Sequence, residues 1–188
     1  MYLMRLLSVS SVLALCLLLN LHGISNGEED NEIFLKWENL NKRVVSAYQQ
    51  GDYNAGVKFA QEAFQYAKEK FGEKHPSTLT SMNNLAELYR AQGRYGEAEP
   101  LYKQALQLRQ EVLGLKHPST LTSMNNLAGL YDSQGRYGEA EPLYKQALQL
   151  SQEVLGLKHP STLTSMNNLA ALYYSQGRYG EAEPLYKQ

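Results

Sequence analysis

The chain has 188 residues, of which 43% are hydrophobic and 20% are charged. This composition is typical of a folded protein and excludes a disordered chain. The formal net charge of −1 excludes the strongly basic surface of a nucleic-acid-binding protein. The one cysteine, Cys16, excludes a disulfide framework and a site of several thiolates within the chain.

The first segment, 1–27, predicts an export signal. It holds one charged residue, Arg5, and its apolar run over 6–21 is about 24 Å long as a helix. A bilayer core is roughly 30 Å thick, so the run suits a cleaved secretory signal better than a stable anchor. We therefore expect a secreted or periplasmic protein that begins at Glu28. The alternatives are a membrane anchor, or a misassigned start codon and a cytoplasmic protein.

One unit of 42 residues repeats along the rest of the chain. The segment HPSTLTSMNNLA occurs unchanged at 75–86, 117–128 and 159–170. The predicted divisions are a short acidic linker over 28–32, a divergent first repeat over 33–74, full repeats over 75–116 and 117–158, and a last repeat over 159–188 that is truncated in its second helix. The two full repeats differ at four positions only, which are 87/129, 90/132, 91/133 and 109/151.

The sequence of each repeat predicts two helices. Pro76 suits the first turn of the first helix, and Gly114 suits the left-handed residue beyond the second. Pro100 lies just past the first turn of the second helix, where it costs a hydrogen bond or bends the helix. Helical spacing places these first-helix residues in the core: Leu79, Met82, Leu85, Ala86 and Tyr89. In the second helix, over about 96–113, it places these inward: Ala98, Leu101, Tyr102, Ala105, Leu108 and Val112.

Such a helical hairpin buries its apolar face only by stacking on its neighbours, which predicts an all-α solenoid. The segment LAELYRAQGRYGEAEPLYKQAL, at 85–106, resembles a tetratricopeptide repeat. The 42-residue period and the two repeated segments are similar to the kinesin light chain type of this family. The resemblance implies a right-handed solenoid whose first helices line the concave side.

The same resemblance implies a non-enzymatic scaffold that binds a protein or peptide segment in its concave groove. No nucleophile–base set or phosphate loop stands outside the repeat pattern, so we expect no catalytic residue and no cofactor. Two alternatives remain open. One is a cytosolic cargo adaptor like the kinesin light chains, and the other is a structural protein that self-associates through its open C-terminal end.

The candidate groove residues share the face of the first helix opposite the core. The varied positions 87, 90 and 91 lie on that face, which favours a recognition surface over neutral drift. Amides suit a peptide backbone, and by resemblance Asn84, Asn126 and Asn168 are the clamps. The alternative is that one asparagine of each pair caps a neighbouring loop or helix. The full candidate set is Asn83, Asn84, Glu87, Arg90, Asn125, Asn126, Asp132, Asn167, Asn168 and Tyr174.

Three histidines, His75, His117 and His159, occupy the same turn in successive repeats. Stacking spreads them along the solenoid, so they cannot converge on one metal ion at ligand distances near 2 Å. We expect them to stabilise the turn instead, and we expect no metal site.

Overall fold

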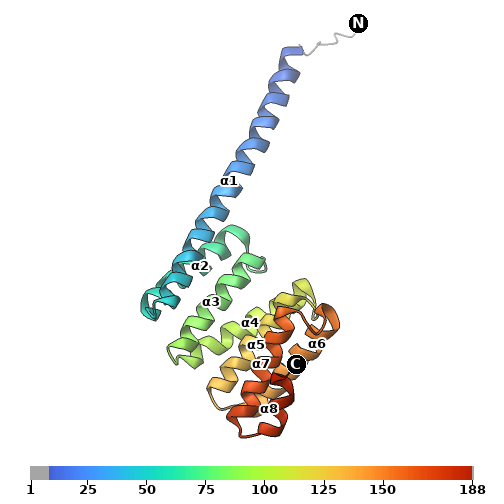
Figure 1. Cartoon of the computed structure of the whole chain (residues 1–188). Helices are drawn as coiled ribbons and strands as arrows, with labels where there is room; N and C mark the ends of the chain where they lie inside the picture. The colour runs from blue at the N-terminus through green and yellow to red at the C-terminus, as the bar shows by residue number, and fades with distance from the viewer. Residues whose placement is uncertain (1–8, 188) are drawn as a thin grey trace. The chain divides into compact units, whose positions relative to one another are not determined.

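The computed structural model describes residues 9–187, with side chains from residue 27 onward. No strand occurs in this range, and the all-α class is confirmed. Figure 1 shows the helices in chain order, and their bounds are α1 (Val9–Gln49), α2 (Tyr53–Phe71), α3 (Pro76–Ala91), α4 (Tyr95–Leu113), α5 (Pro118–Ser133), α6 (Tyr137–Leu155), α7 (Pro160–Ser175) and α8 (Tyr179–Tyr186).

The chain divides into two units, Met1–Asn39 and Leu40–Gln188. In the first unit the expected linker, 28–32, lies within α1. The predicted export signal, with Cys16, lies outside the described side chains, so its cleavage stays a prediction. Across the residues with described side chains, no helix is long and apolar enough to cross a membrane.

The second unit is a stack of helical hairpins. Each helix from α2 to α8 packs against the next one in the chain. The first helices of successive repeats also contact one another, α3 with α5 and α5 with α7, whereas α4 and α6 make no such contact within the described range. Closer packing on one side curves the stack, so the first helices line the inside of a solenoid.

The histidines begin the first helices. His75 has extended backbone, and its Nδ1 accepts a hydrogen bond from the Ser77 backbone N–H over 3.1 Å. Pro76 follows as the first helical residue, where its missing N–H leaves no hydrogen bond unmade. The same bond recurs at His117 and His159. The expected role of the histidines in the turn is therefore confirmed.

The second helices end as predicted. Gly114 follows α4 with φ of +85°, and its N–H bonds to the Gln110 carbonyl. A residue with a side chain is strained at this φ, so glycine is required there. Pro100 lies inside α4, which continues to Leu113.

The predicted core is buried except for Leu101, which is partly buried, and Val112. All five predicted residues of α3 are at most 7% exposed, and Tyr102 and Ala105 of α4 are fully buried. Val112 was expected in the core, but it is 44% exposed, whereas Arg109 is only 7% exposed. The expectation failed because α4 packs against both α3 and α5, so its buried face turns toward α5 near its C-terminal end.

Ionic contacts join successive repeats at the edge of the core. The guanidinium of Arg136 lies over the ring of Tyr131, 4.2 Å from its centre, and donates to Glu99 of the preceding repeat over 2.7 Å. Lys103 pairs with the same carboxylate over 2.6 Å. Arg178, Tyr173 and Glu141 repeat this arrangement one unit later, so the last two junctions are closed by the same set of groups.

Candidate functional site

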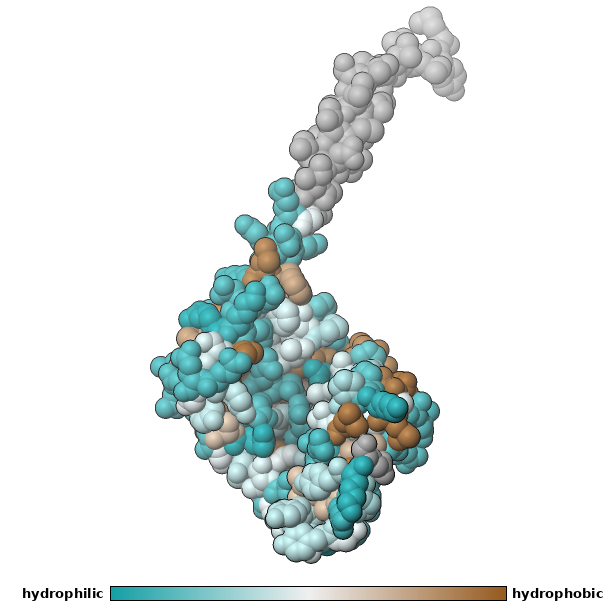
Figure 2. Space-filling model, in the orientation of Figure 1, coloured by the Kyte–Doolittle hydropathy of each residue, from teal (hydrophilic) through white to brown (hydrophobic). Residues whose placement is uncertain are grey.

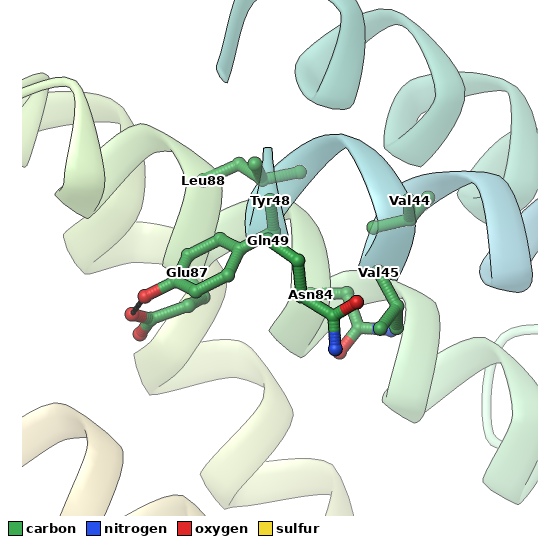
Figure 3. A pocket seen from close by; sticks show the side chains of 7 residues that line it. All are labelled: Val44, Val45, Tyr48, Gln49, Asn84, Glu87 and Leu88. Atoms are coloured by element: carbon green, nitrogen blue, oxygen red, sulfur yellow. Dashed lines mark hydrogen bonds between the residues drawn. The ribbon is translucent and has the colours of Figure 1, made fainter. Parts of the chain in front are cut away.

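Three cavities open along the inner face of the solenoid. The apolar cavity, of about 310 Å³, lies between α1 and α3 (Figure 3) and is lined by Val44, Val45, Tyr48, Gln49, Asn84, Glu87 and Leu88. The acidic cavity, of about 290 Å³, is lined by Glu87, Arg90, Asn125, Asn126, Gly129, Asp132, Ser133, Tyr144 and Asn168. The serine cavity, of about 240 Å³, is lined by Pro118, Leu121, Thr122, Asn125, Asn126, Ser151, Leu155, Ser161, Thr164, Ser165 and Asn168.

Glu87 separates the apolar cavity from the acidic one. Its carboxylate accepts hydrogen bonds from the Tyr102 hydroxyl over 2.6 Å and from the Tyr48 hydroxyl over 3.1 Å, the latter drawn in Figure 3. Arg90 donates from Nε over 3.0 Å and from Nη2 over 2.5 Å. Burial alone raises the pKa of Glu87, but the bonds from Arg90 and Tyr102 outweigh it and hold the pKa below its ordinary value. Glu87 is therefore a charged and fully bonded group.

The third repeat, 117–158, lacks this carboxylate, and its absence opens the acidic cavity. Gly129 stands where Glu87 stands one repeat earlier, and a Cβ built on it would lie 3.2 Å from the Tyr144 hydroxyl. Tyr144 corresponds to Tyr102 and is 4% exposed, yet its hydroxyl finds no acceptor among the described residues. Burial, together with the charge of Asp132, raises the pKa of Tyr144 to about 12.

Asp132 gives the acidic cavity its net charge. It replaces Arg90 of the preceding repeat, and burial raises its pKa while the charge of Arg90 partly offsets that effect. Arg90 itself is neutralised by Glu87. One negative charge therefore remains in the cavity.

The serine cavity opens where the third repeat, 117–158, has Ser151 in place of Arg109. Arg109 of α4 reaches α5 and donates from Nη1 to the Ser123 hydroxyl over 2.7 Å and to the Ser119 carbonyl over 3.2 Å. One repeat later the same position is Ser151, which is 1% exposed and too short to reach α7. The space that Arg109 fills is left open there.

The paired asparagines bond between repeats. The Asn84 amide donates to Asn41 Oδ1 over 3.0 Å, and the Asn126 amide donates to Asn83 Oδ1 over 3.0 Å. The pattern changes at the junction between the third repeat and the last one, where Asn125 donates to the Ser165 hydroxyl over 2.9 Å. Asn84 and Asn126 thus use one amide N–H within the protein and border a cavity with the rest of the side chain.

The structure brings most of the predicted groove residues together. Six of them line the acidic cavity, which are Glu87, Arg90, Asn125, Asn126, Asp132 and Asn168. Asn84 lines the apolar cavity, and Asn83 accepts the bond from Asn126. Asn167 is exposed on α7. Tyr174 lies apart, 61% exposed, with its ring 5.1 Å from that of Tyr179.

Some lining residues were not predicted. Tyr102 and Tyr144 were assigned to the core alone, although their hydroxyls reach the inner face. Ser151 could have been found, because it is one of the four differences between the full repeats. An exposed apolar ridge was also missed, and Figure 2 shows it where the turns α4–α5 and α6–α7 lie in Figure 1. Its residues are Val112, Leu115, Val154 and Leu157.

The inner face offers hydrogen bonds and charge but no metal ligand set. Among the residues with described side chains, no group of three histidine, cysteine or acidic residues is placed to hold a metal ion. The polar groups of the cavities are amides, hydroxyls, the Glu87–Arg90 ion pair and the unpaired carboxylate of Asp132. Such groups recognise a ligand by hydrogen bonds and charge.

Comparisons with known proteins agree with this architecture. The Tetratricopeptide repeat family matches residues 38–111, 83–153 and 133–188. No curated protein sequence matches the chain. A P. anserina kinesin-light-chain-like structure with nearly identical TPR-like repeats is 29% identical, with a TM-score of 0.72, over 81% of this chain and 72% of that one.

Two further structures show the same fold. BtubC (BKLC) from P. vanneervenii is 25% identical, with a TM-score of 0.66, over 76% of this chain. This chain spans 57% of the length of BtubC. Aspartyl phosphate phosphatase F from Bacillus subtilis is 20% identical, with a TM-score of 0.68, over 81% of this chain and 38% of that one, which shows the fold alone. The repeats match the family over most of the chain and resemble those of the kinesin light chain type, so this chain belongs to the tetratricopeptide repeat family.

Proposed function

We propose that this protein is a non-enzymatic scaffold that binds an extended segment of a partner protein along the inner face of its solenoid. The family is typically one of protein-binding scaffolds, and the cavities described above lie on the face that such a segment would meet. The bound segment would run across α3, α5 and α7 and cover the acidic cavity.

One observation carries this proposal: the differences between the two full repeats all fall on or beside cavities. Gly129, Asp132 and Ser133 line the acidic cavity, and Ser151 lines the serine cavity. The other 38 positions of the repeat, obtained as 42 − 4, are identical. A framework that stays the same while its cavities change in shape and charge is suited to selective recognition.

The amides supply a second line of support. An asparagine side chain has two N–H donors and an acceptor, so one inter-repeat bond does not use it up. Asn84 and Asn126 each donate one N–H to the preceding repeat, and this bond also fixes the orientation of the side chain. The remaining groups are then held ready for a peptide backbone, which lowers the entropic cost of binding.

A selection experiment tests the proposal. Random displayed peptides are selected against the folded chain, and amide hydrogen exchange then locates the bound peptide. We expect protection on α3, α5 and α7. Protection confined to α4 and α6, or no selected peptide at all, would contradict binding on the inner face.

We also propose that residues 1–27 direct export and are removed. The support is their apolar run, their single charge and the acidic sequence that begins at Glu28. The intact mass of the protein from its native source measures this directly. A chain that begins at Met1 would contradict export with cleavage.

A cargo adaptor of the kinesin light chain type is a second candidate, and the likeness to the P. anserina repeats favours it. It predicts co-purification with a motor protein from the native source, and export of the chain would rule it out. Self-association through the last repeat also stays a prediction. Sedimentation velocity over a hundredfold range of concentration measures it, and a constant monomer mass would contradict it.

A further inference from the structure

Arg109 shows what the junction between two repeats can hold. Its side chain is 7% exposed, and its guanidinium donates to the Ser123 hydroxyl over 2.7 Å and to the Ser119 carbonyl over 3.2 Å. Both acceptors belong to α5, the first helix of the following repeat. A buried guanidinium is therefore accommodated at this junction by neutral oxygen acceptors.

The next junction has the acceptors without the arginine. Ser161 and Ser165 stand where Ser119 and Ser123 stand one repeat earlier, and both line the serine cavity. Ser151 replaces Arg109, and its buried Oγ makes no hydrogen bond within the described part of the chain. The buried Oδ1 of Asn125, in the same lining, is also left without a donor. Two buried polar atoms therefore remain unsatisfied where the preceding junction holds a cation.

The lining favours a hydrogen-bond donor. One N–H of the Asn125 amide donates to the Ser165 hydroxyl, which in turn donates to the Ser161 carbonyl over 3.1 Å. The hydroxyls of Thr122 and Thr164 donate to carbonyls of their own helices. These N–H and O–H groups are engaged within the protein, whereas the buried Oδ1 of Asn125 is left without a donor. The apolar part of the lining, from Leu121 and Leu155, suits the aliphatic stem of a long side chain.

The charge of the inner face favours a cation as well. The serine cavity shares Asn125, Asn126 and Asn168 with the acidic cavity. In that neighbouring cavity the charges of Glu87 and Arg90 cancel, and Asp132 leaves one negative charge. A positively charged group entering from the inner face is therefore attracted and an anionic one is repelled.

We propose that the serine cavity binds an arginine side chain of the partner segment, in the position that Arg109 fills one repeat earlier. The source of that side chain rests on the proposed function. The site itself does not, because it consists of groups of this chain alone. Arginine fits better than lysine because a guanidinium, which is more weakly hydrated than an ammonium, is the group that the preceding junction already holds against these acceptors.

The first test uses a small probe and the full chain. Nα-acetyl-arginine methylamide is titrated into isotopically labelled protein, and the backbone signals of α5 and α7 are followed by NMR. We expect saturable shifts there, at least tenfold weaker binding of the neutral citrulline analogue, and no shifts with the glutamate analogue. Equal binding of arginine and citrulline analogues, or no binding of arginine, would overturn the proposal.

Two reciprocal substitutions then locate the site. Ser151→Arg refills the cavity with the residue that the chain itself uses at position 109, so it should weaken probe binding at least tenfold. Arg109→Ser opens the equivalent cavity one junction earlier, so it should add a second site for the probe. Each variant carries a residue already present at that repeat position, and circular dichroism checks that it folds. Unchanged binding in Ser151→Arg would overturn the site.

The matched control removes one charge elsewhere. Glu153→Gln changes an exposed carboxylate that pairs with Lys116, so it should leave probe binding unchanged. Asp132→Asn should weaken it about threefold, since the charge lies in the neighbouring cavity. If the probe binds but no peptide is selected, the peptide-binding function fails and the arginine site stands. If peptides bind equally well with and without arginine, the arginine site fails and the peptide-binding function stands.

Discussion

The Tyr102 hydroxyl donates to the Glu87 carboxylate over 2.6 Å, whereas Tyr144, the same residue one repeat later, faces Gly129 and has no such acceptor. Two nearly identical repeats therefore present different surfaces on the inner face. The first presents a closed ion pair supported by two tyrosines. The second presents a cavity with an unpaired Asp132.

Replacement of Glu87 tests the closed arrangement. Glu87→Ala leaves the half-buried Arg90 without its counter-ion and the Tyr102 hydroxyl without its acceptor. We expect a loss of about 2 kcal/mol in the free energy of unfolding, less than for a fully buried pair because both side chains keep some exposure. Urea unfolding measures it. The control Glu97→Ala breaks an exposed pair with Arg94 and should cost less than Glu87→Ala does. Equal losses would contradict the assignment.

Gly129→Ala tests whether the acidic cavity is truly open. Alanine improves helix propensity by about 1 kcal/mol, but its Cβ would lie 3.2 Å from the Tyr144 hydroxyl. The hydroxyl borders empty space, so it can move by the small distance required, and we expect a net gain in thermal stability. The reverse change in the next repeat, Ala171→Gly, should cost about 1 kcal/mol. A destabilised Gly129→Ala protein would show that Tyr144 is fixed in place.

The helix-starting histidines give a third prediction. His117→Ala removes the acceptor for the Ser119 N–H and should cost about 1 kcal/mol of stability. His117→Asn offers a different side-chain acceptor at the same place and should restore most of that loss. Thermal unfolding of the two variants separates the cases. An equal loss in both would mean that the imidazole contributes by packing and not by capping.

Acid should weaken the junctions between repeats. Hydrogen bonds from Arg136 and Lys103 lower the pKa of Glu99 from 4.5 to about 2, and Arg178 and Lys145 do the same for Glu141. Because the folded-state pKa is depressed, this stabilisation is fully present above pH 4.5 and is lost as the pH falls toward 2.

A double variant measures that contribution. Glu99→Gln with Glu141→Gln should make the urea midpoint less dependent on pH between 4.5 and 2. A second double variant, Glu28→Gln with Glu32→Gln, controls for the loss of two negative charges outside the repeats. If both double variants follow the pH dependence of the original protein, the junction carboxylates do not supply the effect.

The fold was predictable because the 42-residue period can be read directly from the sequence. Identical segments in fixed register reveal the hairpin, and the helical spacing of Leu79, Met82 and Tyr89 reveals its buried face. Val112 was misplaced because a helical wheel gives each helix one buried face. The second helix packs against two neighbours, and its face toward α5 buries Arg109 instead.

The candidate site was predictable only in part. Sequence variation pointed to the positions of Glu87 and Arg90, and the structure places both at the acidic cavity. The sequence could not show that Asn126 bonds to Asn83, because a bond between repeats depends on how the hairpins stack. For the same reason it could not show that Ser151 leaves a cavity, since the group it fails to reach lies in the next repeat.

The measurement that tests the central claim most directly is the affinity of a selected peptide for a variant of the inner face. Asn84→Ala, Asn126→Ala and Asn168→Ala are combined, and calorimetry compares this protein with the original. A matched triple variant of exposed glutamines on the outer helices, Gln104→Ala, Gln107→Ala and Gln149→Ala, serves as the control. We predict at least a tenfold loss of affinity in the asparagine variant, as expected for several lost hydrogen bonds, and none in the control. Unchanged affinity in a folded asparagine variant would contradict binding on the inner face.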